Sequence, residues 1–264
     1  MTGLRKMSDI DINRVRNRLE DCIVGHSINL YETTESTMDE AKRLAEDGAP
    51  EGTVIVAENQ KAGRGRFDRL WMSEPGKDLL FSVVFRPNAA QAAYINMAAA
   101  LTIWRSVAEA TGLDASIKWP NDVKLAGRKV SGILVESTVT HANVEHTVLG
   151  VGLNVNSSPG AVPEIAATAT SMYSESGRTF NRADILIEVL RELDRRYALI
   201  RAGSSMKEEW SSRLETLGQR VRVQWKDNTD EGIATGVDEI GNLILTKADG
   251  TTKTIVAGEV TLQA

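Results

Sequence analysis

The segment KAGRGRFDRLW, residues 61–71, lies between two apolar runs, TVIVAEN (53–59) and DLLFSVVFRP (78–87). Both runs have the length and the β-branched or aromatic content of strands, so the segment between them is predicted to be a loop. Gly63 and Gly65 allow the backbone of this loop to turn tightly or to approach a ligand closely. The arginines that alternate with these glycines bind phosphates and carboxylates. The sequence therefore predicts an anion-binding loop between two strands.

Helices and strands alternate along the chain on both sides of this loop. Thr37-Met-Asp-Glu40 fits a helix capping box, and Gly48 stops the helix that it begins. Residues 89–111 are rich in alanine and contain no glycine or proline, which predicts one long buried helix closed by Gly112. The other expected elements are a polar helix at 9–20, strands at 28–37, 116–119 and 146–156, a hairpin at 123–138 turning at 126–127, a loop region at 157–180, a helix at 182–202 capped by Asn181, and a helix from Ser204 or Ser205 to Gly218.

Short alternating strands replace this pattern after Glu215. They occur in residues 219–225, 232–246 and 251–263, separated by turn sequences rich in Asp, Asn and Gly. This pattern of short strands and turns predicts a small β-barrel or meander. We therefore predict two domains, residues 1–214 and 215–264. The first is expected to have an α+β fold, with a mixed β-sheet and flanking helices.

The composition is that of an ordinary globular protein of 264 residues, with 42% hydrophobic and 25% charged residues. The formal net charge of -5 disfavours a general nucleic-acid binder, which carries a basic excess. Cys22 is the single cysteine, so the chain forms no internal disulfide, and a reducing cytoplasm is the expected compartment. No apolar run is long enough to cross a membrane, and the N-terminal residues lack the apolar core of a signal peptide.

Common catalytic and nucleotide motifs are missing from the sequence. No GxxxxGK[ST] run exists, and the glycine pairs at 63/65 and 150/152 lack the third glycine of a dinucleotide fingerprint. No Gly-x-Ser-x-Gly elbow is present. The spacing of His141 and His146 puts them on opposite faces of a strand, which disfavours zinc binding.

Four other features attract attention, although each has a structural interpretation by itself. Ser36 and Thr37 begin a helix, where they either bind a polar ligand group or cap the helix. Lys118 stands at a predicted strand end, where it is either a site residue or a solvated one. Gly132 either lets a ligand approach or marks a bulge. Trp71 is either a stacking platform or a core residue.

In combination and order, these features resemble the biotin protein ligases. The resemblance spans at least residues 30–156, and the small β-domain matches the C-terminal domain of that family. It implies the class II synthetase-like fold of the biotin ligases. Because few residues precede the motifs, it also implies the short form without an N-terminal DNA-binding domain. The motifs that carry the resemblance are EST (35–37), QKAGRGRFDRLW (60–71), KWPND (118–122), GILVE (132–136) and GVGLN (150–154).

The resemblance implies an ATP-dependent ligase acting in two steps. Biotin is first activated as biotinyl-5'-AMP, and the biotinyl group then passes to a specific lysine of a biotin carboxyl carrier protein. Lys118 and Arg66 are the implied catalytic residues. The implied biotin-binding residues are Ser36, Thr37, Gln60, Arg64, Gly65, Arg66, Lys118 and Gly132; those implied for ATP or the adenylate are Gly63, Arg64, Arg66, Trp71, Lys118, Asn121, Asp122 and Asn154. Mg²⁺ is expected with ATP, no metal ligand is assigned, and a homodimer is expected.

Lys118 is expected to be the central cation of the first step. The biotin carboxylate and the α-phosphate repel each other by roughly 4 kcal/mol at about 4 Å and an effective dielectric near 20. A cation fixed between them offsets this repulsion. Two rival functions stay open at this point. One is a lipoate ligase with the same adenylation chemistry, and the other is a non-catalytic biotin-binding module. A biotin-responsive DNA-binding repressor is disfavoured by the acidic charge balance and the few residues before the motifs.

Overall fold

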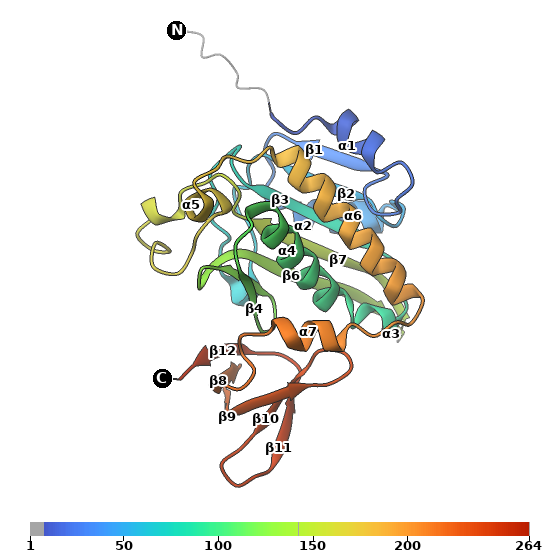
Figure 1. Ribbon diagram of the computed structural model, residues 1–264. Helices are drawn as coiled ribbons and strands as arrows, with labels where there is room; N and C mark the ends of the chain where they lie inside the picture. Colours follow the sequence, from blue (N-terminus) through green and yellow to red (C-terminus); the bar gives the residue numbers. More distant parts are fainter. Residues whose placement is uncertain (1–7, 142, 264) are drawn as a thin grey trace.

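Within residues 8–141 and 143–263, which the computed structural model describes, a seven-stranded mixed sheet forms the centre of the larger domain (Figure 1). Its strand order is β1-β2-β3-β7-β6-β5-β4. β1 and β2 run parallel, and all other neighbours are antiparallel. The strands are β1 (Ile28–Tyr31), β2 (Val54–Ala57), β3 (Leu79–Phe85), β4 (Ala115–Lys118), β5 (Asp122–Leu125), β6 (Arg128–Thr140) and β7 (Asn143–Leu153). The predicted mixed sheet with flanking helices is confirmed.

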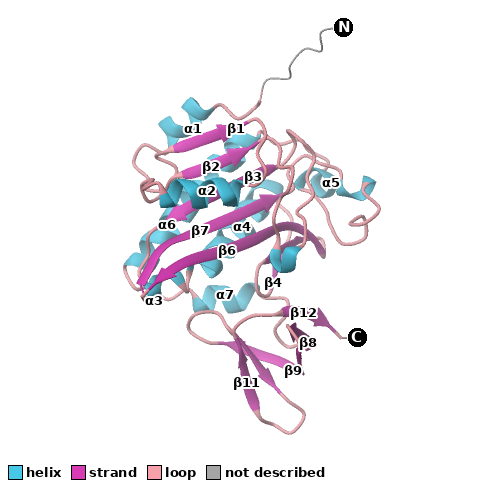
Figure 2. Ribbon diagram, turned by 180° about the vertical axis from the view of Figure 1, so that it is seen from behind, coloured by secondary structure: helices cyan, strands magenta, loops and turns pink. Residues whose placement is uncertain are grey.

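Helices cover both faces of this sheet. α4 (Ile95–Thr111) and α6 (Arg182–Arg201) pack together on one face, and α2 (Thr37–Glu46) lies on the other (Figures 1 and 2). The central strands are apolar on both sides because both faces are covered. Val54 and Val56 of β2 join the core under α4 and α6, whereas Ile55 between them joins the cluster around α2.

The local signals at three element ends are confirmed. Gly112 ends α4 in a left-handed conformation with φ of 72°. Ala126 and Gly127, with φ of 48° and 77°, form the turn between β5 and β6. Asn181 caps α6, because its side chain accepts a hydrogen bond from the backbone N–H of Asp184 at 3.0 Å.

Two helix predictions are wrong in detail. The N-cap of α2 is Ser36 and not Thr37, because the Ser36 hydroxyl accepts from the backbone N–H of Met38 at 3.3 Å. The expected single helix at 89–111 is divided into α3 (Ala89–Ala92) and α4. Asn88 and Gln91 form a capping box at the start of α3, in which the side chain of each accepts a hydrogen bond from the backbone N–H of the other. The alanine-rich composition of residues 89–111 gave no indication of this separate short helix.

The helix expected from Ser204 or Ser205 to Gly218 is also shorter. It is α7 (Lys207–Arg213), with Met206 as N-cap. The chain leaves the helix after Arg213 because Leu214 pairs with Ile117 of β4. The N–H of Glu215 also donates to the Ile117 carbonyl at 3.0 Å. Tertiary pairing therefore overrides the local helical pattern. The remaining short helices are α1 (Ile12–Arg18), η1 (Arg66–Asp68), η2 (Pro159–Ala161) and α5 (Met172–Ser176), the last two within the expected loop region.

The C-terminal part forms a second, antiparallel five-stranded sheet below the first in Figure 1. Its strand order is β11-β10-β9-β8-β12, so β11 and β12 are its two edges. The predicted small β-domain is confirmed, and the boundary between residues 214 and 215 stays a prediction. The strands are β8 (Arg220–Trp225), β9 (Asn228–Val237), β10 (Leu243–Thr246), β11 (Thr252–Ile255) and β12 (Glu259–Leu262).

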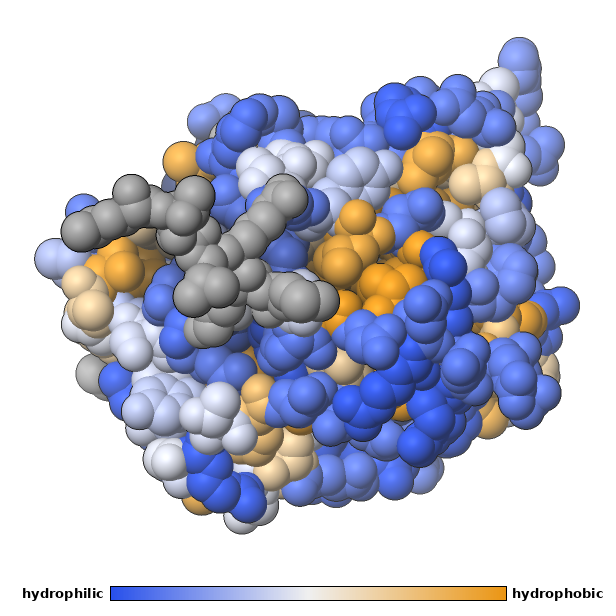
Figure 3. Space-filling view, turned by 90° about the horizontal axis from the view of Figure 1, so that it is seen from above, coloured by the Kyte–Doolittle hydropathy of each residue, from blue (hydrophilic) through white to orange (hydrophobic). Residues whose placement is uncertain are grey.

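The surface agrees with the bulk composition. Seen from above, the described surface is mostly hydrophilic, with one larger apolar area near the centre of that face and smaller ones towards its edges (Figure 3). No helix in the described part of the chain is long and apolar enough to cross a membrane. Residues 1–7, on which the expectation about a signal peptide partly rests, lie outside the described residues.

A partly buried ion pair between α6 and α7 gives the fold a predictable response to acid. The fully buried Arg196 guanidinium donates to both carboxylate oxygens of Glu209, at 2.8 and 2.9 Å. These hydrogen bonds lower the pKa of Glu209 below its ordinary value of 4.5, against the opposing effect of burial. A carboxylate with a lowered folded-state pKa contributes stability above its unfolded pKa, and this contribution is lost as pH falls through the folded value.

We therefore expect Glu209→Gln to lower the free energy of unfolding at pH 7 and to match the unsubstituted protein at an acid pH that protonates Glu209 in the folded state, below its ordinary pKa. Urea titrations at both pH values measure the difference. Glu208→Gln, at the exposed neighbouring position of α7, is the control and should have little effect at either pH. An equal loss for Glu209→Gln at both pH values would contradict the ion-pair explanation.

Candidate active site

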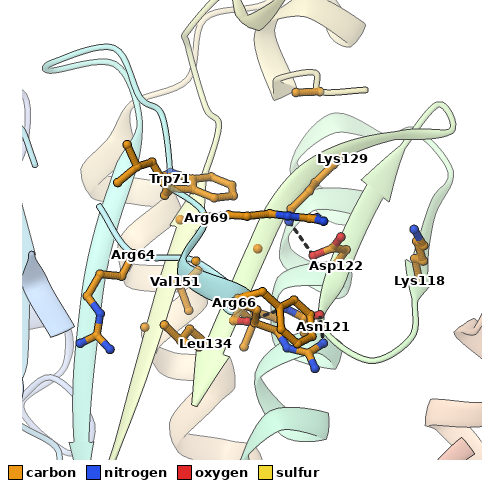
Figure 4. A pocket seen from close by; sticks show the side chains of 18 of the residues that line it. Arg64, Arg66, Arg69, Trp71, Lys118, Asn121, Asp122, Lys129, Leu134 and Val151 are labelled. Carbon is orange, nitrogen blue, oxygen red and sulfur yellow. Dashed lines mark hydrogen bonds and ion pairs between the residues drawn. The ribbon is translucent and has the colours of Figure 1, made fainter. Parts of the chain in front are cut away.

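A cavity of about 540 Å³ lies over the edge of the mixed sheet, a volume suited to a small-molecule ligand (Figure 4). Five parts of the chain form its walls: the N-terminus of α2, the segment 60–72, the β4–β5–β6 region, β7 with the segment 165–169, and the start of β12. It brings together every site residue that the sequence analysis proposed except Gly63. The proposed residues in its walls are Ser36, Thr37, Gln60, Arg64, Gly65, Arg66, Trp71, Lys118, Asn121, Asp122, Gly132 and Asn154.

One end of the cavity is polar. Gln60 Oε1 accepts from the backbone N–H of Thr37 at 2.7 Å and from its hydroxyl at 3.0 Å. Ser82 of β3 donates to the Thr37 hydroxyl at 2.8 Å. Thr37 and Ser36 are both nearly fully buried. Because these groups are fixed before any ligand arrives, this end is a preorganised set of donors and acceptors for a compact polar group.

The two arginines of the loop lie in different surroundings. Arg66 donates from Nη1 to Asn121 Oδ1 at 3.0 Å, and its guanidinium lies 4.8 Å from the Phe67 ring centroid. Burial lowers the pKa of Arg66, although the charge of Asp122 opposes this, and an arginine stays protonated under such a shift. Arg66 is therefore a partly desolvated cation in the cavity wall.

Arg64 points away from these side chains (Figure 4). It forms ion pairs with Asp39 of α2 at 2.7 Å and with Glu136 of β6 at 2.5 Å. Carboxylates thus engage both Nη1 and Nη2 of Arg64. Both arginines were expected to bind biotin and the adenylate, with Arg66 also catalytic, and the sequence carries no signal that carboxylates hold Arg64.

Trp71 lies against two glycines of neighbouring strands. A Cβ atom on Gly152 of β7 would lie 2.2 Å from Trp71 Cε2, and one on Gly132 of β6 would lie 2.8 Å from Trp71 Cζ3. Only glycine at these positions allows the indole to sit this close to the sheet. The Trp71 Nε1 atom is buried against Gly152 and has no hydrogen-bond partner within the described residues. Gly63, outside the cavity wall, packs against the Trp71 backbone instead.

A second lysine, which the sequence analysis did not assign to the site, lies beside Trp71. Lys129 Nζ is 2.7 Å from Asp122 Oδ1 and 5.5 Å from the centroid of the Trp71 ring (Figure 4). Lys118 lies beyond Asp122 on the edge strand β4, and its ammonium forms no ion pair within residues 8–141 and 143–263. Lys129 follows the hairpin turn in β6, where a sequence pattern indicates only a strand residue. Lys129 comes close to Gly132 and Trp71 only through the tertiary fold.

The side chains of Asn154 and Asn121 are bound to backbone carbonyls of neighbouring segments. The Asn154 side chain donates to the carbonyl of Thr170 at 2.8 Å, and it thereby holds the end of the segment 165–170 against β7. Asn121 donates to the carbonyl of Ile133 at 2.7 Å while it accepts from Arg66. No group of three or more His, Cys, Asp or Glu side chains in the described ranges is arranged to hold a metal ion.

The second domain contacts the segment between β4 and β5, which forms part of the cavity wall. Trp119 is 2% exposed, and its backbone N–H donates to the Thr216 hydroxyl at 3.1 Å. Its indole N–H donates to the carbonyl of Gly241 at 2.8 Å. Lys124 of β5 pairs with Glu215 at 2.6 Å. The segment between β4 and β5 is therefore held from both domains.

Comparison with known proteins agrees with this arrangement. Residues 30–154 match the biotin/lipoate A/B protein ligase family, and residues 216–262 match the biotin protein ligase C-terminal domain. The biotin–acetyl-CoA-carboxylase ligase of Mycobacterium tuberculosis is 34% identical over 92% of this chain and 93% of that protein. The chain belongs to the biotin protein ligase family. The family and fold predicted from the motifs are thus confirmed.

Other biotin protein ligases are similar over most of the chain. The bifunctional ligase/repressor BirA of Bacillus subtilis is 31% identical over 95% of this chain and 78% of that protein. The solved structure of the biotin protein ligase from Aquifex aeolicus in complex with biotin and ATP aligns with a TM-score of 0.75. That alignment covers 90% of this chain and 98% of that one, at 29% identity. Both ligands predicted from the sequence are therefore ligands of a close structural relative.

Proposed function

We propose that this cavity converts biotin and ATP to biotinyl-5'-AMP and then transfers the biotinyl group to a lysine of a biotin carboxyl carrier protein. The observation that carries the proposal is the meeting of three features in one cavity. These are a fixed polar end at Thr37 and Gln60, an indole seated on two glycines, and a set of cations at Arg66, Lys118 and Lys129. They suit a polar ring, an adenine base and two anions respectively.

In the first step, a carboxylate oxygen of biotin attacks the α-phosphorus of ATP. A new P–O bond forms, the bond to the β-phosphate breaks, and pyrophosphate leaves. The polar groups of Ser36, Thr37 and Gln60 would bind the ureido ring, and Gly132 would let the ligand approach the sheet. Arg66, already desolvated, would bind phosphate oxygens more strongly than an arginine in water does.

We assign the central cation to Lys129 and keep Lys118 as a second cation for the phosphates. Lys129 lies between the indole and Asp122, next to Gly132, and this is where a carboxylate coming from the polar end would meet the α-phosphate of a nucleotide on Trp71. Lys118 lies farther out at the sheet edge, and its ammonium forms no ion pair with the described side chains, so it is suitably placed for the leaving pyrophosphate. The motif-based prediction of Lys118 as the central cation is the competing assignment.

Mg²⁺ would enter this site bound to ATP. The ion usually keeps several waters and takes one or two carboxylates together with substrate phosphates, so a protein cage of three ligands is not required. Among the described residues, Asp122 and Glu259 provide the carboxylates in the cavity wall, and Asp122 is the one beside both lysines. The ion would offset the charge of the leaving pyrophosphate. Asn121 and Asn154, already bound to neighbouring backbone, would act mainly by holding the cavity walls.

In the second step, the ε-amine of the carrier lysine attacks the carbonyl carbon of the mixed anhydride. An amide bond forms, AMP leaves, and the amine loses a proton to solvent. The loop that contains Gly63 and Gly65 would limit the access of water to the anhydride before the carrier arrives. Arg64 would contribute by leaving Asp39 or Glu136 and turning to the bound adenylate.

Incubation with ATP, Mg²⁺ and either biotin or lipoate, followed by addition of a biotin carrier domain, tests this function. Intact-mass spectrometry of the carrier is the measurement. The expected result is an ATP-dependent gain of one biotinyl group. A lipoyl gain instead would identify the rival ligase activity. Biotin binding without any change of carrier mass would identify a non-catalytic biotin-binding module and would overturn the proposal.

The assembly and location of the protein are also proposals. We expect a homodimer, which sedimentation of the purified protein would detect, and a cytoplasmic location. The net charge of -5 supports a protein that binds no nucleic acid through a general basic surface.

A further inference from the structure

The anion-binding loop touches the second domain at two points. The Phe67 and Trp225 rings meet edge to face, with centroids 5.9 Å apart and an interplanar angle of 64°. Arg69 Nη2 lies 2.7 Å from Glu259 Oε2 at the start of β12. Phe67 and Arg69 are loop residues, and Trp225 and Glu259 belong to the five-stranded sheet. The loop is therefore held on its outer side by a different domain from the one that contains its ends.

Phe67 has an unusual backbone. Its φ is 56°, in the left-handed region that a bulky side chain rarely adopts. Such a conformation persists when the surrounding contacts determine it, and it often occurs at functional sites. Here the ring is 44% exposed and has contacts of two kinds: the guanidinium of Arg66 and the edge of Trp225.

These contacts form a continuous chain from the second domain into the cavity. Trp225 meets Phe67, the Phe67 ring lies under the Arg66 guanidinium, and Arg66 Nη1 donates to Asn121. The charge of Glu259 also acts directly on Arg66, in addition to pairing with Arg69. Gly258, Glu259 and Val260 lie in the cavity wall themselves. The position of Arg66 over the cavity is thus determined partly from the five-stranded sheet.

We infer that Trp225 and Glu259 are positioning residues that hold the loop, and with it Arg66, in the conformation that forms the first intermediate. Neither residue needs to touch the reacting atoms. Because the Arg69–Glu259 pair is exposed, it contributes little by itself, and the aromatic contact with Trp225 is the main part of this attachment. The catalytic consequence rests on the proposed function, whereas the attachment itself can be tested without it.

The test compares Trp225→Ala with Trp225→Phe in the full chain. Two readouts are measured: hydrogen exchange of the backbone amides in residues 63–71, and the single-turnover rate of pyrophosphate release with biotin and ATP. We expect Trp225→Ala to raise loop exchange and to slow pyrophosphate release about three- to tenfold, the range that corresponds to one aromatic pair. Trp225→Phe keeps an aromatic ring at this position, so its loop exchange and its rate of pyrophosphate release should both lie close to those of the unsubstituted protein. A general loss of stability in the alanine variant would not be expected to follow this pattern.

The ion pair has its own matched control. Glu259→Gln is expected to raise loop exchange slightly, by less than Trp225→Ala does. Glu231→Gln removes a comparable exposed pair with Arg222 in the same sheet, at 2.6 Å, and should leave loop exchange unchanged. Unchanged exchange in residues 63–71 for Trp225→Ala, or equal defects in the Ala and Phe variants, would overturn the inference. If the unsubstituted protein releases no pyrophosphate, the proposed function fails, and the exchange measurement still decides whether the attachment exists.

Discussion

Lys129→Ala is expected to slow formation of the biotinyl adenylate by roughly 10²–10³, the usual effect of removing one preorganised electrostatic contact to the transition state. The ammonium of Lys129 is fixed by Asp122 at 2.7 Å and by the face of Trp71, so the cation is in place before the substrates arrive. Its removal also leaves the Asp122 carboxylate unpaired near the phosphates, which adds repulsion. The initial rate of pyrophosphate release, with both substrates saturating, measures the effect.

Lys118→Ala, measured in parallel, separates the two assignments. We expect it to raise the KM for ATP, with a smaller loss of kcat, because Lys118 lies at the outer edge of the site. Lys61→Ala is the control, since Lys61 is in the same loop segment but is paired with Glu35 at 3.2 Å outside the cavity wall. A loss of 10² or more for Lys118→Ala with less than about tenfold for Lys129→Ala would make Lys118 the central cation.

Arg182→Ala is expected to lower the free energy of unfolding by about 3–5 kcal/mol, the typical cost of breaking a buried ion pair from one side. The Arg182 side chain is 2% exposed and pairs with Glu58 at 2.7 Å and with Asp9. It also donates to the carbonyl of Asp78 at 3.1 Å. Truncation would leave the largely buried Glu58 carboxylate without its cation. Urea unfolding at pH 7 measures the loss.

Arg195→Ala is the matched control for this experiment. Arg195 lies on the same helix, is 48% exposed, and pairs with Glu192 at 2.7 Å. Exposed pairs contribute about 0–1 kcal/mol, so this variant should unfold almost like the original protein. Similar losses for the two variants would mean that the burial of Arg182 has no special energetic role.

The sequence predicts the local parts of this fold well because their signals are local. Gly112 ends a helix, Ala126-Gly127 turns a hairpin, and Asn181 caps α6, each through backbone conformations or caps specified within a few residues. The end of α7 is different. There the chain leaves the helix because Leu214 pairs with Ile117, almost a hundred residues away in the sequence, and no local pattern specifies that pairing.

The candidate site also has some features that the sequence predicted and others that it did not. The motifs correctly predicted which segments meet, and they predicted the family. They did not indicate that Lys129 lies beside Trp71, since this depends on β6 and β7 presenting glycines to the indole from positions 132 and 152. They also gave no sign that Arg64 is held by Asp39 and Glu136. Such contacts are set by side chains from separate elements, and they become visible only when the fold is known.

Trp119 has a consequence for the exchange of domains between related ligases. Its two N–H groups are satisfied by the Thr216 hydroxyl and the Gly241 carbonyl, both beyond the catalytic sheet. A chimera that takes its C-terminal part from another ligase must therefore keep a hydroxyl at position 216. It must also keep the turn at 241, where φ is 85° and a Cβ would lie 3.2 Å from Trp210 Nε1. Recombination that ignores these two positions would disturb the segment carrying Asn121 and Asp122 even where every cavity residue of the catalytic sheet is kept.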